Sequence, residues 1–236
     1  MKYLKTDIAR MDMDSGEDTQ ESLVLLENQV AGSRERLAAL APDAGPEARA
    51  IILTEIAGAL IRLEKQKEAW AAAREAFDLG VATEAWEAAI QALEAMFLCE
   101  QPESLAALGQ ALWLAVTFPV DPELTVAMLQ HVIDETPPDA DGAAVAATVA
   151  HYVADMRMPP GKERENLLFY TNQMLATVAR RHGDVQDQTA FDHWFKRLEL
   201  DDPAKFLVRL RNVVDVLVQD HWWIDRDALH AKLPNE

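Results

Sequence analysis

Apolar residues recur along the chain at steps of three and four, and strand-like alternation of apolar and polar residues is nearly absent. This spacing places the apolar side chains on one face of an α-helix. Proline, glycine and aspartate residues separate the apolar stretches. The pattern predicts an all-α chain with helices over residues 19–40, 46–63, 66–79, 83–98, 102–115, 122–134, 143–156, 162–181, 187–198 and 203–217, followed by a last helical turn.

Several residues at the breaks suggest specific helix ends. We expect Gly80 to end the helix over 66–79, because glycine adopts the left-handed conformation that often terminates helices. Thr83 and Asp121 are expected N-caps of the helices that follow them, since their side-chain oxygens accept hydrogen bonds from free backbone N–H groups. Pro46 is well placed to open a helix.

The stretch from Leu53 to Phe77 has the clearest helical pattern, and we expect the rest of the chain to be organised around it. It predicts two amphipathic helices joined by a short charged turn. Ala69, Ala73 and Ala76 give the second helix a face of small residues, which allows its backbone to approach a neighbour closely. Such a pair cannot bury its apolar face alone, so it needs a further pair to stack on.

The residues of this pair resemble the tetratricopeptide repeat. The matching positions are Leu53, Ile56, Ala57 and Leu60 in the first helix and Ala69, Ala73 and Ala76 in the second. A degenerate second unit lies 36 residues on, with Ala89, Ala92, Leu93, Met96, Leu105, Gly109 and Leu112. The sequence departs from the repeat because Ala57 replaces a glycine, Leu60 replaces a tyrosine-like residue, no proline closes the unit, and a third copy loses register near Asp141. The resemblance implies stacked antiparallel helical hairpins, a TPR-like α-solenoid; an irregular helical bundle is the alternative.

Charge divides the chain unevenly. The net charge is −18, and residues 1–160 carry 11 Lys/Arg and 27 Asp/Glu, whereas residues 161–236 carry 11 and 13. No Lys or Arg lies between Arg74 and Arg157. Such a surface repels nucleic acid and attracts a basic segment of a protein partner; the alternative is that the acidity only maintains solubility.

The breaks and the charge together predict three segments. Residues 1–18 are expected to be disordered or loosely attached, residues 19–158 to form an acidic helical-hairpin array, and residues 162–236 to form a helical C-terminal subdomain that caps it. The boundary is expected at residues 158–161, where Pro159 and Pro160 precede a glycine.

Composition excludes several classes of protein. No apolar run approaches the ~20 residues of a membrane-spanning helix, and the first residues lack the apolar core of a secretory signal. The single cysteine, Cys99, excludes an internal disulfide and a cysteine-based zinc site, and we expect it to be a small buried hydrophobe. We therefore expect a cytoplasmic protein without a cofactor.

The sequence also offers few candidate catalytic or metal-binding residues. No phosphate-binding glycine loop, dinucleotide fingerprint or metal-binding histidine motif is present. Asp227 and His230 have the helical spacing of two metal ligands, but we expect no metal there. The histidines of two further acid–histidine pairs, Asp192-His193 and Asp220-His221, are interpreted as surface residues beside buried tryptophans.

Aromatic residues are concentrated near the end of the sequence. Trp194 lies on an apolar stripe that we expect to be buried against the face of the helix over 203–217. At least one of Trp222 and Trp223 is expected to remain partly exposed as a partner contact, since tryptophan is common at interface hot spots. The candidate partner-contact residues are Trp222, Trp223, Glu84, Glu87 and Glu94.

These features favour an adaptor or assembly factor, such as a chaperone, that binds one protein partner through a helical-repeat surface. Size, acidity and helical content fit a dedicated assembly chaperone of redox enzymes, although the Glu-Pro-x-Asp-His motif of the twin-arginine-substrate chaperones is absent. A non-catalytic accessory subunit of a larger complex is the alternative. An enzyme with an unrecognised helical active site is a third hypothesis.

Overall fold

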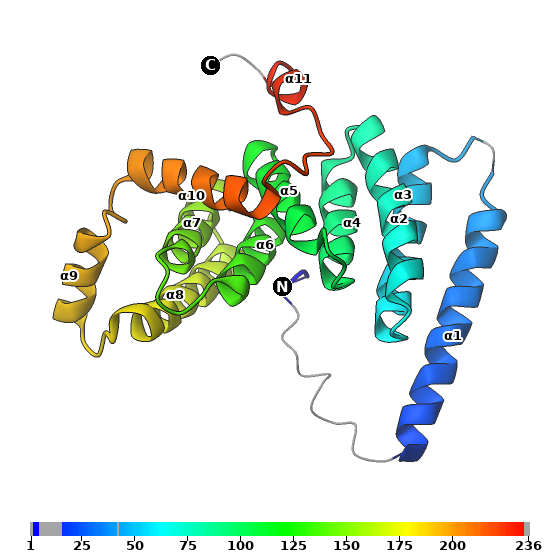
Figure 1. Ribbon diagram of the computed structural model, residues 1–236, viewed down its shortest axis with the longest axis horizontal. Helices are drawn as coiled ribbons and strands as arrows, with labels where there is room; N and C mark the ends of the chain where they lie inside the picture. Colours follow the sequence, from blue (N-terminus) through cyan, green and yellow to red (C-terminus); the bar gives the residue numbers. More distant parts are fainter. Residues whose placement is uncertain (1, 5–15, 42, 234–236) are drawn as a thin grey trace.

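The computed structural model describes residues 2–4, 16–41 and 43–233, and this part of the chain contains eleven helices and no strand (Figure 1). The helices are α1 (Gly16–Ala38), α2 (Pro46–Arg62), α3 (Gln66–Ala82), α4 (Trp86–Leu98), α5 (Ser104–Thr117), α6 (Pro122–Glu135), α7 (Gly142–Arg157), α8 (Lys162–Gly183), α9 (Gln188–Arg197), α10 (Pro203–Val218) and α11 (Arg226–His230). The prediction of an all-α chain is confirmed. None of the described helices is long and apolar enough to cross a membrane.

Helices α1 to α5 form an array in which each helix packs on the next one in the sequence, and α2 also contacts α4 (Figure 1). The small residues of α3 make these contacts possible. Ala69, Ala73 and Ala76 are all fully buried. The expected close approach of helices at this alanine face is therefore confirmed, and the array consists of adjacent helical hairpins.

Gly80 does not end α3, as expected from the sequence, but lies inside this helix. A Cβ atom added to Gly80 would lie 2.9 Å from the backbone nitrogen of Ala89 in α4. Real Cβ atoms essentially never come so close to another backbone. The glycine is therefore needed for the approach of α3 to α4, a requirement that depends on the neighbouring helix.

The turn between α3 and α4 is instead made by Glu84, which has a φ of 58°. Ala85 donates its N–H to the carbonyl oxygen of Gly80, the six-to-one bond of a Schellman motif. Thr83 is the C-cap of α3, and its hydroxyl donates to the carbonyl of Leu79 at 2.8 Å. The predicted N-cap at Thr83 is thus wrong, because Thr83 still belongs to the end of α3 and the chain turns only at Glu84.

Helix α5 lies at the centre of the molecule, and eleven of its fourteen residues are buried. Helices α4, α6 and α10 pack against it. The stretch from Leu53 to Phe77, by contrast, belongs to α2 and α3 toward one end of the array (Figure 1). The expectation that this stretch organises the chain is wrong, since the later helix α10 returns to cover α5.

Helix α10 crosses α5 at Gly109 and also packs on α7 (Figure 1). A Cβ atom at Gly109 would lie 2.5 Å from Cγ2 of Val218 and 2.9 Å from Cβ of Leu217. Helix α9, which was expected to dock on the apolar face of α10, packs on α8 instead. That docking prediction is wrong, because α5 and α7 take up the apolar face of α10.

One cluster of buried hydrophobic residues runs from Ala50 in α2 to Leu229 in α11 and draws on both sides of residues 158–161. Residues 5–15, most of the segment expected to be disordered, lie outside the described residues. Residues 2–4 lie against α6, because the backbone N–H groups of Tyr3 and Leu4 donate to Oε1 of Glu123 at 2.6 and 3.1 Å. The expected N-cap at Asp121 is confirmed, since its side chain accepts from the backbone of Glu123.

Candidate functional site

The segment that follows α10 packs against helices of the array, which lie much earlier in the sequence. We call residues 219–233 the tail; it contains α11, and it passes over α5 toward α3 and α4 (Figure 1). Residues 221–223 have no regular secondary structure. The residues that contact the tail are Trp70, Arg74, Phe77, Gln110 and Trp113, with Glu84 at the edge of this surface, and we refer to the surface as the tail groove.

Gln110 holds the main chain of the tail. Its side chain is fully buried within α5, where apolar residues surround it in the sequence. The side-chain Nε2 donates to the carbonyl oxygen of His221 at 3.2 Å, and Oε1 accepts from the backbone N–H of Trp223 at 2.7 Å. A buried amide is costly unless it is hydrogen-bonded. The two bonds therefore stabilise both the amide and the irregular backbone of residues 221–223.

Trp223 lies in an aromatic subsite on α3. Its ring makes edge-to-face contacts with Trp70 and Phe77, both with ring centroids 6.1 Å apart. The guanidinium carbon of Arg74 lies 4.9 Å from the centroid of the Trp223 ring. Edge-to-face aromatic pairs and an arginine over an indole are both favourable geometries.

The neighbouring Trp222 turns to the other side of the groove and contacts Trp113 of α5 edge to face, with centroids 6.2 Å apart. Arg226 covers its other side at 4.0 Å and forms an ion pair with Asp215 of α10. Both rings of the pair remain half-buried. The apolar contacts of the tail are completed by two buried aliphatic side chains, Ile224 and Leu229.

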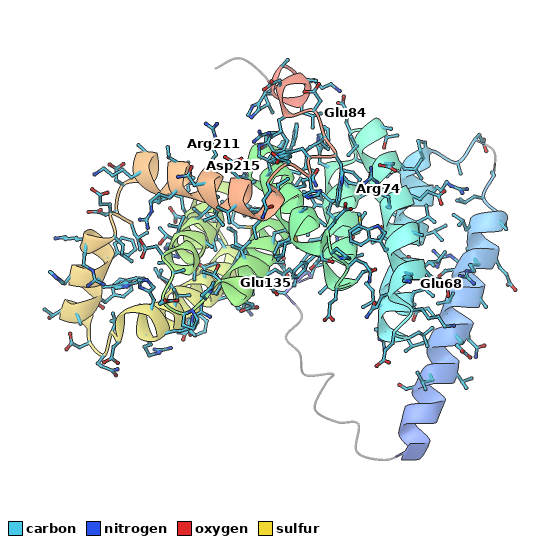
Figure 2. All side chains as sticks on the ribbon, in the orientation of Figure 1. Glu68, Arg74, Glu84, Glu135, Arg211 and Asp215 are labelled. Atoms are coloured by element: carbon cyan, nitrogen blue, oxygen red, sulfur yellow. The ribbon has the colours of Figure 1, made fainter. Side chains whose placement is uncertain are left out.

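An ion pair closes the far end of the groove. Nζ of Lys232 lies 2.6 Å from Oε1 of Glu84, which is located at the α3–α4 turn next to α11 (Figure 2). The two side chains are 51% and 53% exposed. Solvent-exposed ion pairs stabilise a structure only slightly. The aromatic rings and the Gln110 amide therefore contribute most of what holds the tail.

All five candidate partner-contact residues make contacts within the chain. Trp222, Trp223 and Glu84 belong to the tail and its groove, as described above. Oε1 of Glu87 accepts from the backbone N–H of Asp121 at 3.1 Å. Oε1 of Glu94 lies 3.0 Å from Nε2 of His131. The structure thus brings three of the five residues together and separates the other two.

Five residues of this site were not predicted from the sequence: Trp70, Arg74, Phe77, Gln110 and Trp113. Of these, Phe77 was interpreted only as part of an apolar pattern. Gln110 carried a recognisable feature, because it is the only amide side chain within α5. A buried amide in an apolar helix indicates a polar partner, although the sequence does not say where that partner lies.

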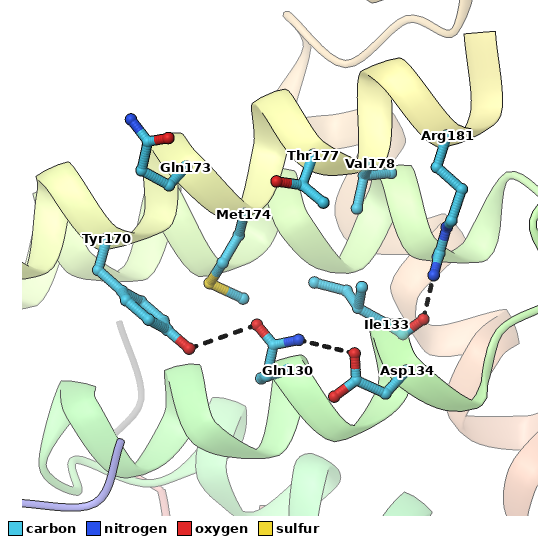
Figure 3. Close-up of a pocket in the computed structure, with 9 residues that line it drawn as sticks. All are labelled: Gln130, Ile133, Asp134, Tyr170, Gln173, Met174, Thr177, Val178 and Arg181. Atoms are coloured by element: carbon cyan, nitrogen blue, oxygen red, sulfur yellow. Dashed lines mark hydrogen bonds between the residues drawn. The ribbon is translucent and has the colours of Figure 1, made fainter. Parts of the chain in front are cut away.

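A second concave region lies between α6 and α8, with a cavity volume of about 240 Å³ (Figure 3). Its lining combines apolar side chains such as Met174 with a short polar chain. The Tyr170 hydroxyl points to Oε1 of Gln130 at 3.5 Å, and Nε2 of Gln130 donates to Asp134 at 2.8 Å (Figure 3). Burial, and then the charge of Asp134, raises the pKa of Tyr170.

This cavity is a weaker candidate than the tail groove. Small-molecule sites commonly have volumes of ~300–1,000 Å³. Tyr170, Gln130 and Asp134 of its lining already bond to one another, and Arg181 donates to the backbone carbonyl of Ile133 at 3.0 Å (Figure 3). No convergent set of unpaired polar groups is therefore offered to a ligand by these residues.

The acid–histidine pairs of the sequence lie at the surface or contact aromatic rings. Asp192 and His193 are exposed on α9. His230, the expected partner of Asp227, lies edge-on to the ring of Trp113 with centroids 5.3 Å apart. Within the described residues no group of three or more His, Cys, Asp or Glu side chains is arranged to hold a metal ion.

Cys99 is fully buried, as expected, and its thiol donates to the carbonyl oxygen of Ala95 at 3.1 Å. Burial raises the pKa of this thiol to about 11. A thiol of such high pKa is almost entirely protonated at neutral pH and is a poor nucleophile. The cysteine therefore contributes packing to the α2–α4 side of the core.

Comparisons of the chain with protein-family models, with curated proteins and with solved structures find no match. The arrangement of its own residues therefore carries the functional argument.

Proposed function

We propose that this protein is an adaptor or assembly factor that binds a specific protein partner on the tail groove of its helical array. The observation that carries the proposal is the Gln110 amide, which is buried in α5 and bonds the main chain of a segment without regular secondary structure. Aromatic side chains from α3 and α5 flank that segment. A surface with these two properties is suited to binding an extended peptide.

The charge of the array supports the same proposal. The stretch from Glu75 to Asp155 contains carboxylates and no Lys or Arg. A partner with a basic segment is attracted by such a surface, and the attraction weakens over a Debye length of ~10 Å at 0.1 M salt. A nucleic-acid partner is not proposed, because its phosphates would be repelled. A tetratricopeptide-like repeat origin and a cytoplasmic location remain parts of the proposal.

Affinity capture from native extract tests the proposed function. The bait proteins are the wild type, Trp70→Ala in the tail groove, and Phe169→Ala as a matched aromatic control that is 67% exposed on α8. A partner should be captured by the wild type and by Phe169→Ala, and several-fold less by Trp70→Ala. Association with the purified partner should also slow as salt rises. Equal capture by all three proteins would contradict a function of this groove.

A second candidate, a non-catalytic accessory subunit, is favoured by one other observation. Leu23, Val24 and Leu25 are exposed in succession on α1, and Ile51 is exposed on α2. Exposed apolar clusters commonly mark surfaces that a partner covers. Replacing Leu25 with glutamate separates the two functions, since it should weaken the assembly of a subunit and leave capture through the tail groove unchanged.

A further inference from the structure

We propose that the tail is an intramolecular ligand of the tail groove, and that a partner binds by displacing it with an extended segment of the same chemistry. This inference rests on the proposed function and concerns the partner and the regulation of the same site. The segment carries two adjacent aromatic residues followed by an aliphatic residue, and a lysine about nine positions further on, as Trp222, Trp223, Ile224 and Lys232 do in the tail.

The contacts of the tail are those of a bound peptide. Gln110 contacts only backbone atoms of residues 221–223, so these two bonds do not depend on the side chains of the bound segment. Specificity comes from the two ring subsites, one at Trp70 and Phe77 and the other at Trp113. Contacts to the peptide backbone that give affinity, combined with subsites for side chains that give specificity, are a common mode of peptide recognition.

The tail is also joined to α10 by a strained residue. Gln219 has a φ of 51° and a ψ of −123°, a backbone conformation that residues other than glycine rarely adopt. The conformation is needed to turn the chain back from α10 into the groove. Release of the tail relieves this strain, so the strain lowers the effective strength of the intramolecular contact.

Other features of the tail favour exchange with a partner. Both tryptophan side chains are half-buried and not fully enclosed, and the ion pair of Lys232 with Glu84 is open to solvent. A tethered segment competes at an effective concentration in the millimolar range. A partner segment therefore gains access by binding more tightly or by binding elsewhere on the acidic surface at the same time.

The test uses the full chain and a fluorescein-labelled peptide with the sequence of residues 219–233. Fluorescence anisotropy measures its affinity for the wild type and for the double variant Trp222→Ala/Trp223→Ala, which keeps the tail but removes both rings. The peptide should bind the double variant about ten-fold more tightly, because its competitor has lost its aromatic contacts. A peptide with both tryptophans replaced by alanine should bind neither protein.

Three further variants locate the interaction. Gln110→Leu added to the double variant fills similar space without the amide, and it should remove most of the peptide binding. Gln219→Gly in the wild type relieves the strain, so the tail should hold the groove more firmly and the peptide should bind roughly three- to ten-fold more weakly. Gln219→Ala retains the strain and should leave peptide binding unchanged. Circular dichroism and thermal midpoints confirm that each variant is folded.

Equal peptide affinity for the wild type and the double variant, or no binding to a folded double variant, would overturn the inference. A wild-type dimer that dissociates when both rings are removed would make a second copy the occupant, and this would overturn the assignment to a partner. If the peptide fails to bind but partner capture still depends on Trp70, the proposed function stands without this inference.

Discussion

Helices α2 to α5 and helices α8 to α10 are held in place in different ways. In the first region each helix packs on its neighbour in the sequence, through faces of alanine such as Ala73 and through glycine at the α3–α4 contact. In the second region α9 packs on α8, whereas α10 packs across α5, a helix that lies about one hundred residues earlier in the sequence. The first arrangement depends on local contacts and the second on distant ones.

A small polar network supports α9 in the second region. The indole N–H of Trp194 donates to Nδ1 of His182 at 3.0 Å, so the other ring nitrogen carries the hydrogen that faces Asp141 at 3.2 Å. Asp141 also pairs with Arg209 of α10 at 2.7 Å. The network therefore joins the start of α7, the end of α8, α9 and α10 through four side chains.

The comparison shows where stability is concentrated. In the array, several helices pack side by side, so the destabilisation caused by the loss of one contact is limited by the contacts that remain. In α9, with only ten residues, docking depends largely on one ring. Short helices do not persist in water without such docking. Substitutions in the two regions should therefore differ in size and in how far their effects spread.

The largest effect is expected from Trp194→Ala. The ring is 2% exposed and packs directly against Gly183, where no Cβ atom could be accommodated. Its removal should lower the free energy of unfolding by ~3–5 kcal/mol, measured by urea denaturation. Phe169→Ala, which truncates an exposed aromatic residue on α8, should change it by less than about 0.5 kcal/mol. Similar losses for the two variants would contradict the importance of this ring.

Gly109→Ala tests the distant contact between α5 and α10. The new methyl group would collide with Val218 and Leu217, and the backbone carbonyl of Val214 lies only 3.4 Å away. Overpacking of this kind typically costs ~1–3 kcal/mol. The matched control is Gly58→Ala in α2, where a Cβ atom meets nothing within 4 Å; it should stabilise the protein by ~0.5–1 kcal/mol. Thermal midpoints that move in the same direction would break the argument.

Ala73→Leu tests the local contacts of the array. Ala73 is fully buried in α3, so the larger side chain should overpack the helix contact and cost ~1–3 kcal/mol. Ala71→Leu on the exposed side of the same helix should cost almost nothing. An unchanged denaturation midpoint for Ala73→Leu would remove the close approach of helices as the basis of the array.

The same contrast explains which features the sequence could predict. The alanine face of α3 and the N-cap at Asp121 were predictable, because their partners lie within a few residues or on the next helix. The role of Gly80 was not, since a glycine serves equally as a helix end or as a place of close approach, and only the neighbouring helix decides. The tail groove could not be predicted from the sequence for a similar reason, because Gln110 bonds to backbone groups more than a hundred residues away.

Glu64→Gly should produce a gain in stability. Glu64 has a φ of 56° at the α2–α3 turn, and the following N–H of Lys65 bonds to the carbonyl oxygen of Leu60 at 2.9 Å. Glycine adopts this conformation without the cost that a side chain imposes, so the variant should be stabilised by ~0.5–1 kcal/mol. Glu27→Gly, within α1, should be destabilising by contrast. A loss of stability for Glu64→Gly would contradict the reported turn geometry.

The smallest effect concerns another distant contact, between residues 2–4 and α6. Burial would raise the pKa of Glu123, but backbone N–H groups of Lys2, Leu4 and Tyr3 outweigh it, and the pKa lies below the usual value. The charged carboxylate therefore favours the docked state. This contribution is fully present above the unfolded pKa of ~4.3 and is lost as the pH falls through the lower folded value. The amide resonances of Tyr3 and Leu4 should shift together in that window.

Glu123→Gln provides the decisive variant, because it keeps the shape of the side chain but not its charge. Its Tyr3 and Leu4 resonances should show no titration and should lie near their acid positions at neutral pH. Glu135→Gln, at the other end of α6, should titrate as the wild type does. Titration that persists without the Glu123 carboxylate would mean that another titratable group holds residues 2–4, and the assignment of this distant contact to Glu123 would then be wrong.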